Sequence, residues 1–158
     1  MAQRILFVDD EHLIRRAFTR AMGYRGFGVD LADGADEALA LAREHTYGVI
    51  ATDYMMPKMD GLTLISELEL VQPEAAFVIV TGMPHRLPSV PGRAVMDVVV
   101  KPWDNQLLAT TLRRAMERHR QLMSRGANPA GSVLLAAEGS RGAALHRLLP
   151  SDLAQGAT

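Results

Sequence analysis

Five short apolar runs alternate with amphipathic segments over the first two thirds of the chain, and this alternation restricts the fold more than any other feature. The runs have the length and residue types of buried strands. They cover Arg4–Val8, Phe27–Leu31, Tyr47–Ala51, Ala76–Val80 and Val95–Val100. Between most of them, apolar residues recur at helical spacing. The alternation predicts a parallel sheet covered on both faces, because right-handed crossovers leave little other choice.

The connection before the fifth strand departs from this rhythm. It contains Pro84, Pro88 and Pro91 where a crossover helix is expected. Prolines at this spacing cannot lie inside one helix. We therefore expect a short, distorted or mobile segment here.

Polar residues stand where the predicted strands end. They are Asp9, Asp10, Asp53, Thr81 and Lys101. The carboxyl ends of parallel strands meet at one edge of a sheet, so these residues are expected to converge although they are scattered in sequence.

The expected cluster has the composition of a site for a hard cation. The aspartates would repel each other unless a cation joins them, and the chain has no cysteine. An all-oxygen ligand set suits Mg²⁺ or Mn²⁺. An ionised Asp53 could then attack a phosphoryl group and form an aspartyl-phosphate, with the metal, Lys101 and Thr81 stabilising charge on the transferring oxygens.

Each of these residues also has a simpler interpretation. Asp9, Asp10 and Glu11 could cap the helix that follows them, since acids favour helix N-termini. Lys101 is harder to explain as an ordinary surface cation, because all but two of the 17 lysines and arginines are arginine and Lys58 is the only other lysine. We expect Lys58 to be exposed.

Size and charge exclude several classes of protein. The chain has 158 residues and a formal net charge of −1, which favours one domain with a tail and gives no general attraction to nucleic acid or anionic membranes. It has no apolar run of the roughly 18 residues that span a membrane. We therefore expect a cytoplasmic protein that binds neither DNA nor membranes directly.

The last predicted helix is capped by Asp104, and its spacing also permits a short dimer seam. The residues of that seam are Asn105, Leu108, Leu112, Ala115, His119 and Leu122. From 123 to 158 we expect a flexible or partner-dependent tail without a recognised output domain. Within the tail, 133–137 and 143–149 could form short pieces of strand or helix.

Four motifs together resemble the receiver domain of bacterial two-component response regulators over residues 3–122. They are Asp9-Asp10, Asp53 with the following Met-Met-Pro-Lys-Met-Asp-Gly, Thr81-Gly82 and Lys101-Pro102. The resemblance implies a flavodoxin-like, doubly wound sheet of strand order 2-1-3-4-5.

The resemblance also implies a role for each site residue. Asp53 would accept a phosphoryl group from a sensor histidine kinase or a phosphotransfer protein. Asp10 would bind Mg²⁺ directly, Asp9 mainly through water, and the Met55 carbonyl would be a further ligand. Thr81 and Lys101 would contact the phosphoryl group, and the Lys101–Pro102 peptide would be cis.

Three features depart from the family pattern. Val98 stands where receivers usually carry an aromatic switch residue. Met55 and Met83 replace polar side chains that often orient the hydrolytic water, so we expect slow self-dephosphorylation. The proline-rich segment replaces a helix that many receivers use to dimerise.

Three functions are compatible with these observations. The first is a phosphorylation-switched receiver that regulates a downstream protein and is not an enzyme in the usual sense. The second is an interaction module that keeps the fold without phosphorylation. The third is a metal-dependent phosphohydrolase, which the lack of an Asp-x-Asp pair at Asp53 disfavours.

Overall fold

The computed structural model describes residues 4–89 and 94–126. The described strands are β1 (Arg4–Val8), β2 (Gly28–Ala32), β3 (Val49–Thr52), β4 (Ala76–Thr81) and β5 (Val95–Val100). The described helices are α1 (His12–Gly23), α2 (Ala35–Glu44), α3 (Gly61–Val71), the 3₁₀ helix η1 (Pro84–Arg86) and α4 (Asn105–Gly126). All five predicted strands are present, and their ends agree with the prediction within two residues.

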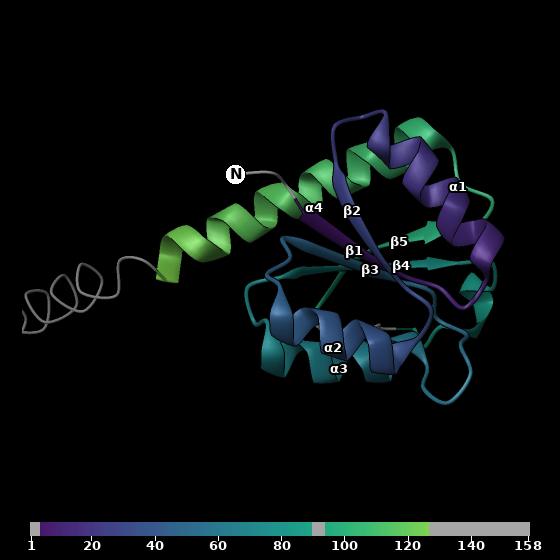
Figure 1. The fold of residues 1–158 in the computed structure, drawn as a ribbon, viewed down its shortest axis with the longest axis horizontal. Coiled ribbons are helices and arrows are strands. Elements are labelled where there is room, and N and C mark those ends of the chain that lie inside the picture. Colours follow the sequence, from purple (N-terminus) through teal and green to yellow (C-terminus); the bar gives the residue numbers. More distant parts are fainter. Residues whose placement is uncertain (1–3, 90–93, 127–158) are drawn as a thin grey trace, which may run out of the picture. The chain divides into compact units, whose positions relative to one another are not determined.

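The strands form one parallel sheet of order β2-β1-β3-β4-β5. Helices α1 and α4 lie on one face of the sheet, and α2 and α3 lie on the other (Figure 1). This is the predicted flavodoxin-like arrangement. The register pairs Val8 with Thr52 and Thr81 with Val100, so the carboxyl ends of the central strands reach the same edge.

Each face of the sheet has its own apolar core. Phe18 and Met22 of α1 and Leu108 and Leu112 of α4 pack on one face. On the other face the core includes Leu64, Leu68, Ala38 and Leu39. Burial on both faces explains why the central strands read as continuous apolar runs.

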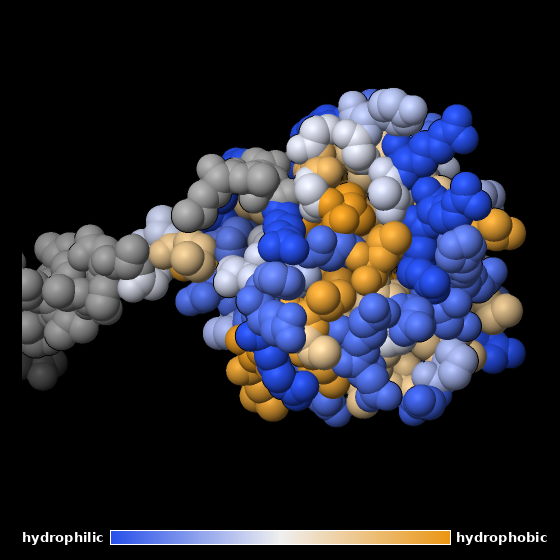
Figure 2. Space-filling model, viewed as in Figure 1, coloured by the Kyte–Doolittle hydropathy of each residue, from blue (hydrophilic) through white to orange (hydrophobic). Residues whose placement is uncertain are grey.

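The proline-rich connection behaves as predicted where it is described. It forms only the three-residue turn of η1 at Pro84–Arg86, while Pro91 lies outside the described residues. Strand β5 is at the edge of the sheet, and its residues from Val95 to Val98 are only partly buried. Hydrophilic side chains cover most of the face shown in Figure 2, with apolar side chains gathered near its middle.

Helix α4 begins as predicted, and most of the residues whose spacing permits a dimer seam lie in the core of this chain. The Asp104 carboxylate accepts a hydrogen bond from the Leu107 amide at 2.8 Å, which caps the helix. Leu108, Leu112 and Ala115 are fully buried against the sheet, so they are not available to a second chain. These apolar residues of α4 form part of the core. The segments predicted at 133–137 and 143–149 lie outside the described residues.

Candidate phosphoacceptor and metal site

Backbone hydrogen bonds between neighbouring strands place three of the predicted site residues at the carboxyl edge of the sheet. The Asp53 amide donates to the Val8 carbonyl at 2.9 Å, and the Asp9 amide to the Ala32 carbonyl at 3.2 Å. The Lys101 amide donates to the Thr81 carbonyl at 2.8 Å. Each functional residue is thus the first one after its strand and is still held by the sheet.

The three aspartates meet, as the strand ends predicted. Asp9, Asp10 and Asp53 each offer a carboxylate oxygen, and these oxygens all lie within 4.8 Å of one another. Asp9 is fully buried and Asp53 is 6% exposed, whereas Asp10 is exposed. The donor set contains only oxygen, so it fits a hard cation such as Mg²⁺ or Mn²⁺. Asp10 leaves the cluster open to solvent.

Lys101 joins two of these carboxylates. Its Nζ lies 2.6 Å from Oδ2 of Asp9 and 3.2 Å from Oδ2 of Asp53, and only 12% of its side chain is exposed. Two buried anions with one buried cation leave a net negative charge, and Asp10 increases it. The site therefore favours a further cation.

The electrostatics of the site follow from burial and from these contacts. Burial raises the pKa of Asp53, and the charge of Lys101 opposes this rise while that of Asp9 adds to it. Burial acts to lower the pKa of Lys101, but its hydrogen bond to Asp9 and the charges of both aspartates outweigh that effect and raise it. Lys101 is accordingly held as a cation.

The loop after β3 orients the Asp53 carboxylate. Its Oδ1 accepts a hydrogen bond from the Tyr54 amide at 2.7 Å, while Oδ2 faces Lys101. The loop returns to its start at Gly61, whose amide donates to the Tyr54 carbonyl at 2.8 Å. A Cβ on Gly61 would collide with the carbonyl oxygen of Asp53. Only glycine allows this close approach of two backbones.

The loop after β1 holds Asp9 in a similar way. Asp9 Oδ1 accepts a hydrogen bond from the Glu11 amide at 2.9 Å, and the Asp9 carbonyl accepts one from Arg15 at 2.7 Å. Glu11 occupies the N-cap of α1 but makes no capping bond with its side chain. Helix capping therefore does not account for Asp9, whose second oxygen binds Lys101.

Other predicted residues lie around this cluster. Thr81 is 1% exposed, and its hydroxyl accepts a hydrogen bond from the Met83 amide at 3.1 Å. Met55 and Met83 are 43% and 45% exposed. Lys58 is exposed as predicted and lies 3.7 Å from Asp36. The Lys101–Pro102 peptide is cis, as the resemblance implied.

Sequence reasoning missed two supporting residues. One is Arg15, because no sequence pattern indicates its bond to the Asp9 carbonyl. The other is Gly61, which belongs to the motif after Asp53 but carries no sequence sign of its close approach to the Asp53 backbone. Asp60, which accepts a hydrogen bond from the Thr63 amide at 2.9 Å, follows the usual N-cap pattern and could have been found.

The sheet order and the clustered acids at its carboxyl edge define the class of protein: a doubly wound α/β domain with an acidic pocket. A family model described as the response regulator receiver domain matches residues 5–113. The chain belongs to the response regulator receiver domain family, whose members are phosphorylation-type signalling modules of two-component systems.

Individual relatives agree with this assignment. The chain is 32% identical over 118 residues to sensor kinase CckA of Brucella abortus. This match covers 72% of this chain and 12% of the kinase. It is 28% identical over 120 residues to response regulator MprA of a Mycobacterium species, covering 75% of this chain and 52% of the regulator. The chain thus spans at most about half the length of these two curated relatives.

One solved structure resembles this fold over nearly the whole length of the solved chain. It is the response regulator protein TrrA from Thermotoga maritima in complex with Mg²⁺ and BeF. The TM-score is 0.67 at 27% identity, and the match covers 73% of this chain and 99% of that one. Among the described residues, no helix has the length and apolar character needed to cross a membrane.

Proposed function

We propose that Asp53 accepts a phosphoryl group from a sensor histidine kinase or a phosphotransfer protein in a reaction that requires Mg²⁺. One observation carries this proposal: three aspartates from two separate loops offer oxygens within 4.8 Å of one another, with the Lys101 ammonium 2.6 Å and 3.2 Å from two of them. A fold alone would not require that concentration of charge.

The residues of this chain divide the reaction between them. A carboxylate oxygen of Asp53 forms the new bond to phosphorus, and the bond from phosphorus to the donor breaks with its electron pair leaving on the donor. The Tyr54 amide holds Oδ1 of Asp53, which orients the carboxylate before attack. Lys101 Nζ stands beside Oδ2 and can contact the phosphoryl oxygens, with the Thr81 hydroxyl as a second donor.

The proposed metal ligands are Asp10, Asp53 and the Met55 carbonyl, with Asp9 acting mainly through water. When bound, Mg²⁺ would supply positive charge to offset the carboxylates and the phosphoryl oxygens. The all-oxygen donor set supports Mg²⁺, and Mn²⁺ is the alternative.

The wider role is a signalling one. We propose that residues 3–122 are the receiver, that 123–158 is a tail outside it, and that the phosphorylated surface regulates a downstream protein. Met55 and Met83 offer no polar group to orient water, so self-dephosphorylation is slow. A role as a phosphohydrolase would require rapid release of phosphate, which these side chains do not support.

The test is the intact mass of the protein after incubation with acetyl phosphate and Mg²⁺. We expect one added phosphoryl group, none after chelation of the metal, and none in Asp53→Asn. Asp36→Asn is the matched control, because Asp36 is an exposed aspartate in the first turn of α2 and outside the cluster. An adduct on Asp53→Asn, or none on the wild type, would overturn the proposal.

A further inference from the structure

Two exposed methionines flank the phosphoacceptor, and both are open to oxidation. The chain has nine methionines and no cysteine, so the sulfur available to an oxidant is all in thioethers. Met55 follows Asp53 by two residues, and Met83 follows Thr81 by two residues. Their exposed fractions are 43% and 45%. An oxidant dissolved in water can therefore reach both side chains.

Strand pairing places the two methionines at the same edge of the sheet as the site. Strands β3 and β4 are parallel neighbours, with Thr52 beside Ile79, so the loops that follow them leave the sheet side by side. The Met83 amide donates a hydrogen bond to the Thr81 hydroxyl at 3.1 Å, and that hydroxyl is a proposed phosphoryl contact. The Met55 carbonyl is a proposed metal ligand. Both thioethers thus branch from backbone that borders the reacting groups.

The other described methionines differ from this pair in burial or in position. Met22 is fully buried and Met116 is 3% exposed. Three more are partly buried and pack against the core, namely Met56, Met59 and Met96. Met123 is 47% exposed and belongs to the last part of α4. No proposed ligand or phosphoryl contact adjoins Met123 in sequence, so it is a thioether of similar exposure outside the site.

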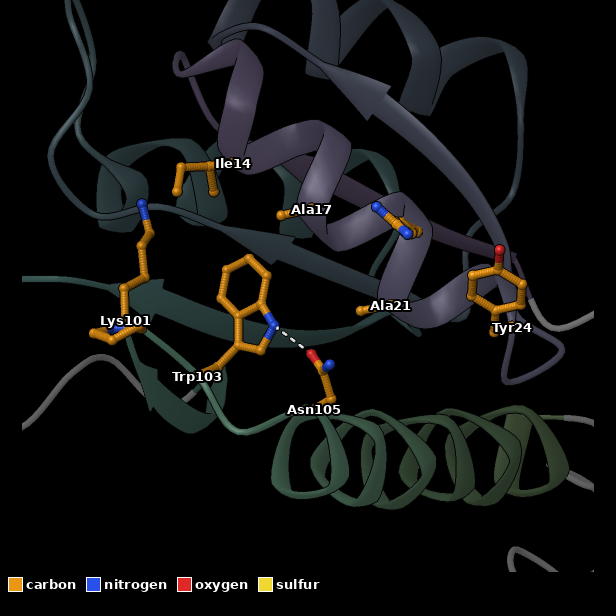
Figure 3. Close-up of a pocket in the computed structure, with 9 residues that line it drawn as sticks. Ile14, Ala17, Ala21, Tyr24, Lys101, Trp103 and Asn105 are labelled. Carbon is orange, nitrogen blue, oxygen red and sulfur yellow. Dashed lines mark hydrogen bonds between the residues drawn. The ribbon is translucent and has the colours of Figure 1, made fainter.

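The thioethers stand in contrast to the polar groups of the site. Lys101 extends from the end of β5 toward α1 (Figure 3), and its Nζ contacts two of the site carboxylates. A thioether is only a weak hydrogen-bond acceptor, so Met55 and Met83 do not hold a water against a phosphoryl group. Oxidation to the sulfoxide makes the same side chains polar. The sulfoxide oxygen is then an acceptor at the edge of the site.

We propose that Met55 and Met83 are oxidation sites through which a peroxide shortens the lifetime of the aspartyl-phosphate on Asp53. The effect on lifetime rests on the proposed function, whereas the oxidation itself does not. In the oxidation step the thioether sulfur attacks a peroxide oxygen, the S–O bond forms as the O–O bond breaks, and water leaves. Sulfur loses two electrons and the peroxide gains them, which gives methionine sulfoxide.

The sulfoxide acts on the hydrolysis of the aspartyl-phosphate. Its oxygen accepts a hydrogen bond from a water and orients that water toward phosphorus. The water oxygen forms a bond to phosphorus, and the bond from phosphorus to the Asp53 oxygen breaks with its electron pair on the carboxylate. Both protons of the water remain on the released phosphate. Reduction of the sulfoxide reverses the change, so the pair forms a redox-sensitive control of the phosphorylated state.

The first experiment locates the oxidised sulfur. The full chain is treated with hydrogen peroxide for increasing times, catalase stops the reaction, and peptide mass mapping gives the sulfoxide fraction at each methionine. We expect the exposed methionines to be oxidised about tenfold or more faster than the buried ones, because a buried side chain reacts only when the fold opens. The exposed ones are Met55, Met83 and Met123, and the buried ones are Met22 and Met116.

The second experiment measures the lifetime of the phosphoryl group by intact mass. Protein oxidised only at its exposed methionines, and untreated protein, are labelled with acetyl phosphate and Mg²⁺, and the donor is then removed. Oxidation should shorten the lifetime about tenfold, because an oriented water attacks more often than a free one. Methionine sulfoxide reductases A and B should restore it. Circular dichroism checks that the oxidised protein is folded.

Two variants separate the pair from oxidation elsewhere in the chain. The double variant Met55→Leu, Met83→Leu keeps apolar side chains of similar volume but has no sulfur at these positions, so peroxide should leave its lifetime unchanged. Met123→Leu removes the similarly exposed thioether of α4, and peroxide should still shorten its lifetime about tenfold. Each variant is compared with its own untreated form, so differences in basal lifetime do not enter.

The outcomes distinguish the oxidation from its effect. Oxidation of Met55 or Met83 no faster than that of Met22 overturns the assignment of the sites. An unchanged lifetime after oxidation overturns the control, and so does a shortening that persists in the double variant or that Met123→Leu abolishes. If acetyl phosphate leaves no adduct on the untreated wild type, the proposed phosphorylation fails and the effect on lifetime falls with it. The order of methionine oxidation still decides the sites in that case.

Discussion

Replacing Gly61 by alanine tests whether the backbone approach at the start of α3 holds Asp53 in place. An ideal Cβ on Gly61 collides with the Asp53 carbonyl oxygen and lies 3.1 Å from both the Asp53 carbonyl carbon and the Tyr54 Cα. All of these are backbone atoms, which cannot rotate away as a side chain can. Gly61 must therefore move, or the Asp53–Tyr54 peptide must.

The expected loss of stability follows from two opposing effects. Overpacking of this kind costs about 1–3 kcal/mol, and the better helix propensity of alanine returns at most about 1 kcal/mol. We expect Gly61→Ala to lower the free energy of unfolding in urea by about 1–2 kcal/mol, with the m-value unchanged. Its rate of labelling by acetyl phosphate should fall by a larger factor than the increase in its unfolded fraction explains.

The matched control is Gly23→Ala at the end of α1. Nothing lies within 4 Å of a Cβ at Gly23, so the helix propensity acts alone and stabilises the protein by about 0.5 kcal/mol. Equal stability changes in the two variants would refute the steric argument. Normal labelling of a destabilised Gly61→Ala would show that the contact supports the fold but not Asp53.

Three further experiments probe the charges of the site, a buried tyrosine outside it, and the access of water to the site. Lys101→Met leaves Asp9 and Asp53 without their cation, so without divalent metal it should lower the free energy of unfolding by about 3 kcal/mol. Mg²⁺ should recover part of this loss, and Lys58→Met should show no loss. A loss of the same size with and without Mg²⁺ would contradict the argument. Tyr47 donates a hydrogen bond to Asp30 at 2.7 Å, and burial together with that bond raises the pKa of Tyr47. The bond therefore stabilises the fold fully below the ordinary tyrosine pKa of about 10, and this stabilisation is lost as pH rises above that value. Tyr47→Phe should lower the free energy of unfolding by about 1 kcal/mol at neutral pH. In alkali its free energy of unfolding should fall less steeply with pH than that of the wild type, and an equal slope in the two proteins would be evidence against this. For the methionines, we expect the aspartyl-phosphate to last on the order of hours, since no polar group orients water, and Met55→Asn with Met83→Asn to shorten its lifetime; decay within about a minute in the wild type would remove the idea.

The strands and the cluster at their ends could be predicted because they depend on local patterns. Apolar runs bounded by polar residues locate β1 and β5 to the residue, and the geometry of a parallel sheet brings Asp9, Asp53 and Lys101 together without further information. The resemblance supplied the strand order, which the residue patterns alone left open.

Features that depend on tertiary packing could not be predicted. The spacing of Leu108 and Leu112 is the same whether the stripe faces the sheet or a second helix, and only the structure shows that it is buried. The bond from Arg15 to the Asp9 carbonyl has no sequence signature, because any arginine on α1 could have made it. The edge-on contacts of Trp103 with Phe7 and Phe18 likewise arise only from how these segments pack.

The affinity of Mg²⁺ for the wild type and Asp10→Asn tests the central assignment most directly. Asp10 is the exposed member of the cluster, so its substitution should leave the fold intact, as urea unfolding without metal would verify. Calorimetric titration should show one Mg²⁺ site that Asp10→Asn weakens about tenfold or more, because one carboxylate–cation interaction near the surface contributes on the order of 1–4 kcal/mol. The control Asp36→Asn should bind Mg²⁺ as the wild type does. Absence of binding to the wild type, or equal weakening by the two variants, would contradict a metal site formed by Asp9, Asp10 and Asp53.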